Sequence, residues 1–293
     1  MQPISPASLL PADLAQALLI GRIWRDGPCV VAVRGGEVVD ITQTVATVAE
    51  LFERSDALDI ARHAPGIALG SVQALLAQAL AAPAGEPLLR APCDLQAVKA
   101  CGVTFAVSLL ERVIEEQAGG DAARAASLRA ALQTTLGSDL SALKPGSDAA
   151  QRLKQQLQQR GAWSQYMEVG IGPDAEVFTK AQPMSSVGCG AQVGLLPSSA
   201  WNNPEPEIVL AVNSRGEVLG ATLGNDVNLR DIEGRSALLL GKAKDNNGSC
   251  AIGPFIRLFD EHFTLDTVRQ AEVSLLIEGA DDGFVLEGAS FMR

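Results

Sequence analysis

The sequence predicts an α+β protein, in which a small β-rich N-terminal domain precedes a larger domain with a mainly antiparallel sheet and a helical insertion. Short apolar and β-branched runs separated by turn residues occupy residues 15–41 and the chain beyond 166, a pattern typical of strands. Ala, Leu, Glu and Arg recur at helical spacing over residues 108–160, which predicts helices. A Pro/Gly cluster at residues 83–87 indicates a linker, so we expect domains at 1–90 and 91–293.

In the first domain, the runs LLIGRIW and CVVAV predict short strands. The pair Gly35-Gly36 between VAVR and EVVDI is typical of a hairpin turn. VATVAELFER then predicts a helix, and a segment of mostly Ala and Leu follows from Gly66.

In the second domain, we expect three helices between residues 108 and 160, interrupted at Gly119-Gly120 and Pro145-Gly146. Five later runs predict the strands of the sheet. They are EVFTK, EIVLAV, EVLGATLG, AEVSLLIEG and FVLEG.

Composition excludes several classes of protein. The 293 residues are 47% hydrophobic, with 23 Lys+Arg against 34 Asp+Glu and a net charge of -11, so a disordered chain and a nucleic-acid partner are not expected. The sequence contains no apolar run of the roughly 20 residues that span a bilayer and no secretory signal pattern. We therefore expect a cytoplasmic protein without membrane contact.

Cysteine and histidine usage narrows the chemistry further. The five cysteines include no C-x-x-C pair, which favours reduced thiols over disulfides or a zinc site. Only two histidines are present, so a metal site would draw on carboxylates, which favour Mg2+, Mn2+ or Ca2+.

Three carboxylates are predicted to meet at one end of a hairpin. Glu205 and Glu207 are two residues apart in a strand and therefore share a face. The turn NSRG that follows places Asp226 opposite Glu205. Such a group repels itself unless a cation lies among its members; the alternative is a solvated acidic hairpin end. Pro206 indicates an edge strand or a bulge.

Downstream, Lys242 lies in the segment Gly241–Asp245, before the turn Gly253-Pro254. A lysine beside a carboxylate-bound cation can hold a substrate carboxylate or enolate, or act as a base. The alternative interpretation is an ordinary surface lysine.

Together these motifs resemble the fumarylacetoacetate hydrolase superfamily. The order is Glu-x-Glu, then Asn225-Asp226-x-x-x-Arg230-Asp231, then Gly-Lys and Gly-Pro. The text GNDVNLRDIEGRSALLLGKAKDNNGSCAIGPFIRLFDE resembles one branch more closely, the 2-keto-3-deoxy-D-pentonate (xylonate or arabinonate) dehydratases of oxidative pentose breakdown. GVTFAVSLLERVIEE and WSQYMEVGIGPDAEVFTKAQPMSSVG are similar to the same branch, and the similarity thins before residue 90.

The resemblance implies a β-roll catalytic domain like that of fumarylacetoacetate hydrolase and a divalent-metal site. It implies that Glu205, Glu207 and Asp226 bind the metal, usually Mg2+. Lys242 matches the superfamily lysine, and Lys244 is the less favoured register for that role. Lys180 and Ser185, in KAQPMSS, match a Lys-Pro-x-Ser-Ser motif at the rim of the site, where substrate binds.

One departure bears on the reaction type. Hydrolases of the superfamily show Tyr-x-x-His-x-x-Glu where this chain has Phe105, Ser108 and Glu111. A serine hydroxyl without a neighbouring base activates water poorly at neutral pH. The resemblance therefore implies a lyase, with Glu111 moving protons and Ser108 in place of the histidine.

The expected reaction is Mg2+-dependent dehydration of a 2-keto-3-deoxy-pentonate to 2-oxoglutarate semialdehyde. The first alternative is a C–C hydrolase or decarboxylase acting on an acylpyruvate or another 2,4-diketo acid; the second is an inactive binding homologue. The resemblance also implies a homodimer or larger homo-oligomer. Dehydratases of this branch continue past the point that matches FVLEGASFMR, so we expect the catalytic domain to be C-terminally incomplete.

Overall fold

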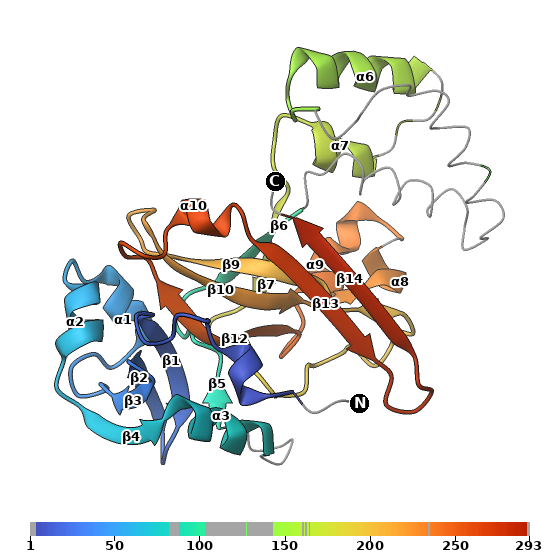
Figure 1. The fold of residues 1–293 in the computed structure, drawn as a ribbon. Coiled ribbons are helices and arrows are strands. Elements are labelled where there is room, and N and C mark those ends of the chain that lie inside the picture. Colours follow the sequence, from blue (N-terminus) through green and yellow to red (C-terminus); the bar gives the residue numbers. More distant parts are fainter. Residues whose placement is uncertain are drawn as a thin grey trace. The chain divides into compact units, whose positions relative to one another are not determined.

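The structure is a computed structural model that describes residues 4–81, 88–102, 127, 143–159, 161, 163, 165–233 and 235–291 (Figure 1). The chain divides into two compact units. Unit 1 comprises Met1–Val98 and Thr179–Arg293, and unit 2 comprises Lys99–Phe178. Strands on either side of residue 90 share one sheet of unit 1, and the predicted domain boundary there stays a prediction.

An eight-stranded antiparallel sheet organises the described part of unit 1. Its order is β4-β3-β2-β1-β12-β10-β9, and β5 pairs with β1. The strands are β1 (Leu19–Trp24), β2 (Pro28–Arg34), β3 (Glu37–Asp40), β4 (Ile67–Ser71), β5 (Leu89–Arg90), β9 (Pro206–Val212), β10 (Val218–Asp226) and β12 (Cys250–Leu258). The predicted α+β class with a mainly antiparallel sheet is confirmed.

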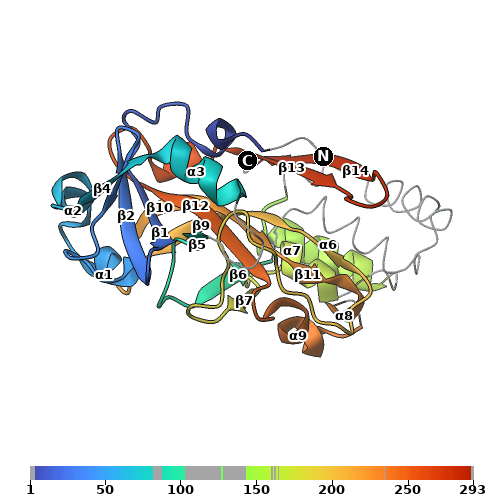
Figure 2. The same cartoon turned by 90° about the horizontal axis from the view of Figure 1, so that it is seen from below.

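Helices cover both faces of β1 to β3. Alternate residues of a strand point to opposite faces, and here both sets are apolar. Ile20 and Ala32 pack with α1 (Val48–Glu53) and α2 (Ala57–His63). Leu19 and Val33 pack with α3 (Val72–Ala81). Figure 2 shows α3 on one side of these strands and α1 on the other.

The predicted first hairpin is confirmed, because β2 and β3 pair across the two residues Gly35 and Gly36. Their φ angles are 55° and 86°. Both lie in the left-handed region that a two-residue hairpin loop requires and that glycine adopts without strain.

The β9–β10 hairpin has the register predicted from NSRG. Gly224 faces Glu207 and Asn225 faces Pro206, and Gly216 has φ 78° in the turn. An irregularity between Val218 and Gly220 shifts the pairing near the turn. In the described sheet β9 is the last strand, as Pro206 predicts.

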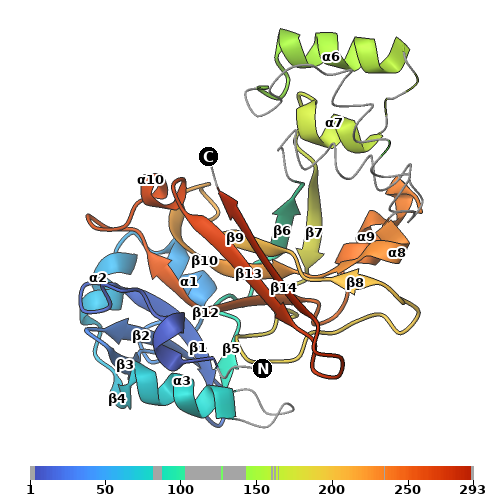
Figure 3. The ribbon, with the colours of Figure 1, turned by 45° about the vertical axis from the view of Figure 1, so that its right-hand side comes forward.

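Beyond the hairpin, short helices that the sequence did not predict pack together. α8 (Arg230–Glu233) and α9 (Leu240–Lys244) contact each other and lie beside β8 (Asn202–Asn203), as Figure 3 shows. The remaining elements of unit 1 are η1 (Pro6–Leu9), β11 (Asn228–Leu229), η3 (Ala237–Leu239), α10 (Leu265–Val268), β13 (Glu272–Glu278) and β14 (Val285–Phe291). β13 and β14 pair and β13 contacts β9.

Unit 2 contains α6 (Asp148–Gln159) and α7 (Gln165–Ile171). The chain runs toward it through β6 (Val98–Cys101) and back through β7 (Val177–Ala181), and these two strands pair. The sequence predicted α6 but not α7. Most of the predicted helical segment, including Ser108 and Glu111, lies outside the described residues.

Two further predictions concern the chain as a whole. All five cysteines carry free thiols, as their spacing indicates. No helix within the described ranges is both long and apolar enough to cross a bilayer.

A buried carboxylate ties α1 to the segment that precedes β6. Asp94 is 3% exposed and accepts the backbone N–H groups of Val48 at 2.7 Å and Ala49 at 3.0 Å. Arg22 Nε lies 3.5 Å from the same carboxylate. Since a buried charge is costly unless it is paired and hydrogen-bonded, this contact fixes the start of α1.

We expect Asp94→Asn to lower the free energy of unfolding by about 2–4 kcal/mol, because the amide removes the charge and sets a donor against backbone donors. Urea unfolding followed by circular dichroism measures the change. The control is Asp56→Asn, since Asp56 pairs with Arg54 on the surface, and its cost should stay under about 1 kcal/mol. Equal losses in the two variants would contradict this description of Asp94.

Candidate active site

The end of the β9–β10 hairpin brings two of the predicted carboxylates together. Glu205 immediately precedes β9 and Asp226 is the last residue of β10. The N–H of Asp226 donates to the carbonyl of Glu205 at 2.9 Å. The strand pairing therefore continues from Asn225 and Pro206 to Asp226 and Glu205. The sequence predicted this opposition.

Lys244 lies between these two carboxylates. It is the last residue of α9 and is 3% exposed. Its ammonium contacts Glu205 Oε2 and lies 3.1 Å from Asp226 Oδ2. An ammonium therefore offsets the repulsion that the two carboxylates would otherwise exert on each other.

Lys180, on β7, reaches the same place from another part of the fold. It is 1% exposed and its Nζ lies 3.2 Å from Asp226 Oδ1. It also donates to the carbonyl of Val227 at 2.8 Å, to that of Lys244, and to Ser249 Oγ at 3.3 Å. An ammonium has three protons, and these groups of the chain itself use all of them.

We call Glu205, Asp226, Lys180 and Lys244 the ion cluster. Two positive and two negative side chains balance one another, and Lys180, Lys244 and Asp226 are buried while Glu205 is partly buried. Buried ions persist only when they are paired in this manner.

Burial and pairing shift the pKa values within the ion cluster. Burial raises the pKa of Asp226, against the opposing effects of Lys244 and Lys180. Burial lowers the pKa of Lys180, and Asp226 offsets part of that change. For Lys244 burial also acts to lower the pKa, but Glu205 and Asp226 together outweigh it and the pKa is raised.

A polar network surrounds Glu205. Its backbone N–H donates to Asn225 Oδ1 at 3.0 Å. The amide of Asn228 donates to Glu205 Oε1 at 3.0 Å and also to Glu233 Oε2. Arg230 Nη1 lies 3.4 Å from Glu233 Oε2. Asn228 and Glu233 were not predicted as site residues, although both lie in the same sequence window as Asp226.

The carboxylate and amide oxygens at this end of the hairpin are the ligand types that Mg2+ and similar divalent cations prefer. The Oδ1 atoms of Asn228 and Asn203 are buried and accept no hydrogen bond from any described residue, and Asp226 Oδ1 lies beside the Lys180 ammonium at 3.2 Å. Glu207 faces Gly224 on the adjacent strand. Within the described ranges, no three His, Cys, Asp or Glu side chains are grouped as a metal site requires. Glu205 and Asp226 thus converge on the Lys244 ammonium, and Glu207 as a third ligand stays a prediction.

The other predicted site residues are placed differently. Lys242 is exposed on α9, one residue before the buried Ala243. Ser185 Oγ donates to the carbonyl of Gln182 at 2.9 Å, and Gln182 Nε2 donates to Asp245 Oδ2 at 2.7 Å. Ser108 and Glu111 lie outside the described residues.

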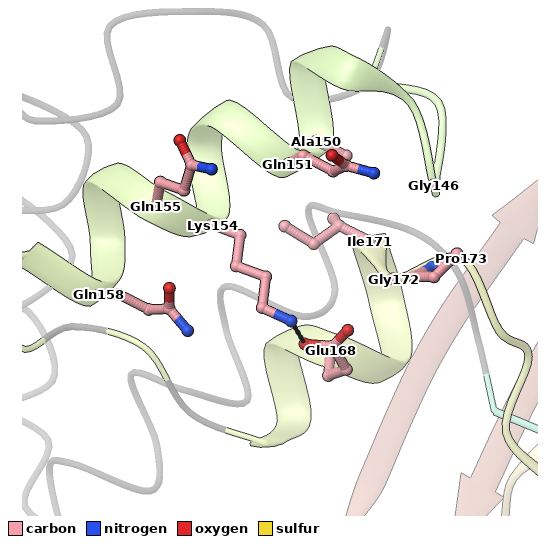
Figure 4. Close-up of a pocket in the computed structure, with 10 residues that line it drawn as sticks. All are labelled: Gly146, Ala150, Gln151, Lys154, Gln155, Gln158, Glu168, Ile171, Gly172 and Pro173. Atoms are coloured by element: carbon pink, nitrogen blue, oxygen red, sulfur yellow. Dashed lines mark hydrogen bonds and ion pairs between the residues drawn. The ribbon is translucent and has the colours of Figure 1, made fainter.

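Unit 2 has a separate cavity of about 310 Å³ between α6 and α7 (Figure 4). The ammonium of Lys154 points into it and pairs with Glu168, which lies on the opposite wall. No predicted site residue is among the lining residues, which are Gly146, Ala150, Gln151, Lys154, Gln155, Gln158, Glu168, Ile171, Gly172 and Pro173.

Comparison with known sequences gives two relevant relatives, while no family model matches the chain. A 2-dehydro-3-deoxy-D-arabinonate dehydratase of Saccharolobus solfataricus is 38% identical over 105 residues, which cover 33% of this chain and 35% of that protein. A probable 2-keto-3-deoxyxylonate dehydratase of Haloferax volcanii is 37% identical over 113 residues, which cover 39% of this chain and 38% of that protein. The matched stretch spans little more than a third of either relative.

Comparison with solved structures covers much more of the chain. A 2-keto-3-deoxy-D-arabinonate dehydratase complexed with magnesium and 2,5-dioxopentanoate superposes with a TM-score of 0.62 and 20% identity, over 94% of this chain and 76% of that chain. The apo form of 2-keto-3-deoxy-D-arabinonate dehydratase gives a TM-score of 0.59 at 18% identity, over 94% and 77% of the two chains.

The structural likeness establishes the fold, and the sequence relatives point to one branch. The predicted resemblance is therefore confirmed: the chain has the fold of a solved 2-keto-3-deoxy-D-arabinonate dehydratase, and part of its sequence is similar to 2-keto-3-deoxy-pentonate dehydratases.

Proposed function

We propose that this protein dehydrates a 2-keto-3-deoxy-pentonate with a divalent cation bound at the end of the β9–β10 hairpin. The observation that carries the proposal is the buried meeting of Glu205, Asp226 and Lys244. It supports the dehydratase because this segment lies in the window whose motifs resemble the dehydratase branch.

For the cation we propose Mg2+, held by Glu205, Asp226 and Glu207. A bound Mg2+ supplies Lewis acidity, which stabilises negative charge on the oxygen of a 2-keto acid and so acidifies its C3 protons. Oxygen donors at one hairpin end and the buried Oδ1 of Asp226 support this assignment. Mn2+ and Ca2+ have the same preference for oxygen ligands.

We propose Lys244, in preference to Lys242, for the role of the superfamily lysine. Lys244 Nζ contacts both carboxylates, whereas Lys242 is exposed. A cation-binding 2-keto acid would bring its oxygens within reach of this ammonium. Lys244 and Glu111 are then the two groups that hold and move protons, with Ser108 close to Glu111 in sequence. Ser185 is the proposed rim residue, whereas Lys180 holds Asp226 from inside the ion cluster.

In the proposed reaction, a base removes a proton from C3, the C3–C4 double bond forms, and the C4 hydroxyl leaves as water after it is protonated. Tautomerisation then yields 2-oxoglutarate semialdehyde, which is 2,5-dioxopentanoate. The arabinonate dehydratase of similar fold was solved with that compound and magnesium. A cytoplasmic location and a homo-oligomeric state stay predictions.

With Mg2+ present, we expect the protein to convert 2-keto-3-deoxy-D-xylonate or 2-keto-3-deoxy-D-arabinonate to 2,5-dioxopentanoate, followed by 1H NMR. Acetylpyruvate serves as the alternative substrate, since a C–C hydrolase would release acetate and pyruvate from it. Turnover of acetylpyruvate alone would contradict the dehydratase and favour the hydrolase. Failure with every substrate would favour a binding homologue.

Glu205→Gln and Asp226→Asn should each weaken Mg2+ binding by at least about a hundredfold, because each removes a charged metal ligand. Loss of a residue that merely orients a ligand already lowers metal affinity by up to about a hundredfold. Isothermal titration calorimetry with Mg2+ measures the effect. Glu217→Gln is the matched control at the turn end of the same hairpin, where Glu217 is an exposed partner of Arg215. Unchanged Mg2+ affinity in the first two variants would rule out this site.

Lys244→Met should lower kcat by about 10²- to 10⁴-fold, the range that a positioned proton-transfer group contributes. Mg2+ affinity should stay equal or increase, because the substitution removes a positive charge from between two carboxylates. Lys242→Met is the comparison, and its kcat should change by less than about threefold because an exposed side chain can be replaced with little effect. The reverse pattern would assign the role to Lys242.

A further inference from the structure

We infer that Asn228 is a positioning residue that fixes which oxygen of Glu205 faces the ion cluster. The inference rests on the proposed cation site and extends it to a residue that no sequence motif singled out. Asn228 opens β11, two residues after Asp226, and is 0% exposed. It is therefore a buried amide next to the place where the cation would bind.

The two sides of the Glu205 carboxylate have different partners. Oε1 accepts the amide of Asn228 at 3.0 Å. Oε2 faces Lys244, which also contacts Asp226. Because Asn228 holds one oxygen on the outer side, the other is directed toward Asp226, where a shared cation would lie.

The orientation of the Asn228 amide follows from its neighbours. Its Nδ2 carries two protons, and they go to two carboxylates, Glu205 Oε1 and Glu233 Oε2. The reverse orientation would place a carbonyl oxygen against two anions. Hydrogen bonds to charged acceptors are roughly twice as strong as neutral ones, so Asn228 is held firmly between them.

Glu233 anchors the outer end of this arrangement. Its carboxylate lies 3.4 Å from Arg230 Nη1, one residue beyond β11. The backbone of Asn228 is fixed as well, because it pairs with Asn203 of β8. The neighbouring Val227 carbonyl accepts from Lys180 at 2.8 Å. Both the side chain and the main chain of Asn228 are thus immobilised before any cation binds.

The experiment compares Asn228→Leu with the wild-type chain. Leucine has a similar volume but no donor, so Glu205 Oε1 loses its 3.0 Å hydrogen bond, and the Asn203 amide at 3.5 Å holds that oxygen less firmly. We expect Mg2+ affinity, measured by calorimetry, to fall about tenfold to a hundredfold, the usual cost of losing a residue that orients a metal ligand. At saturating Mg2+, kcat should fall while KM for the keto acid changes less than about threefold.

Asn213→Leu is the matched control. Asn213 is 7% exposed at the turn end of the same hairpin, and its Nδ2 donates to Glu217 at 2.7 Å and to the Phe52 carbonyl at 3.3 Å. Its loss should lower the melting temperature. Mg2+ affinity should stay within about threefold of wild type, because Asn213 lies at the opposite end of the hairpin from Asp226. A general effect of losing a buried amide would weaken Mg2+ binding in both variants, which would overturn the inference.

Asn228→Ser covers the case in which the leucine variant does not fold. Serine is too short to bridge both carboxylates, so it should weaken Mg2+ binding in the same direction. Wild-type Mg2+ affinity in a folded Asn228→Ser variant would overturn the inference, as would a wild-type chain that binds no Mg2+. A wild-type chain that binds Mg2+ without dehydrating any keto acid contradicts the proposed function alone, because the affinity measurement needs no substrate.

Discussion

The buried ion cluster of Glu205, Asp226, Lys180 and Lys244 is the interaction on which the site depends. Carboxylates this close repel each other strongly, and taking them out of water adds a desolvation cost. The ammonium groups of Lys180 on β7 and Lys244 on α9 offset both the repulsion and the desolvation cost. The charge requirement therefore joins segments that are far apart in sequence at one end of the sheet.

Different elements of the fold position the members of the ion cluster. The hairpin register sets Asp226 against Glu205, and the large sheet behind it holds β10 between β9 and β12. Lys180 binds the carbonyl groups of Val227 and Lys244, which fixes the chain around both. Asn228 and Glu233 complete the outer side of Glu205. A cation arriving here would find its oxygens oriented, at the cost of competing with the Lys244 ammonium.

Much of this could be predicted from sequence because it depends on local rules. The NSRG turn sets the register of a two-stranded ribbon, and side chains alternate along it, so the opposition of Glu205 and Asp226 followed directly. Pro206 lacks a backbone donor, which predicts the edge position of β9. The short hairpin at Gly35-Gly36 followed from the φ angles that glycine alone adopts readily.

What could not be predicted depends on tertiary packing. The segment with Lys242 and Lys244 has no extended apolar period, so α9 was not predicted. In a helix, residues two apart point about 200° away from each other, so only the helix shows that Lys244 faces inward and Lys242 outward. Asn228 and Glu233 likewise became visible only when β11 and α8 brought them beside Glu205.

The most direct test of the central claim is a crystal structure of the protein with Mn2+ and pyruvate, with anomalous scattering recorded at the manganese edge. We expect an anomalous peak between Glu205 and Asp226, about 2.1 Å from a carboxylate oxygen of each, the distance typical of a small hard cation. We also expect the pyruvate oxygens to lie beside Lys244 Nζ. A peak elsewhere, or pyruvate bound without any metal at the hairpin end, would contradict it.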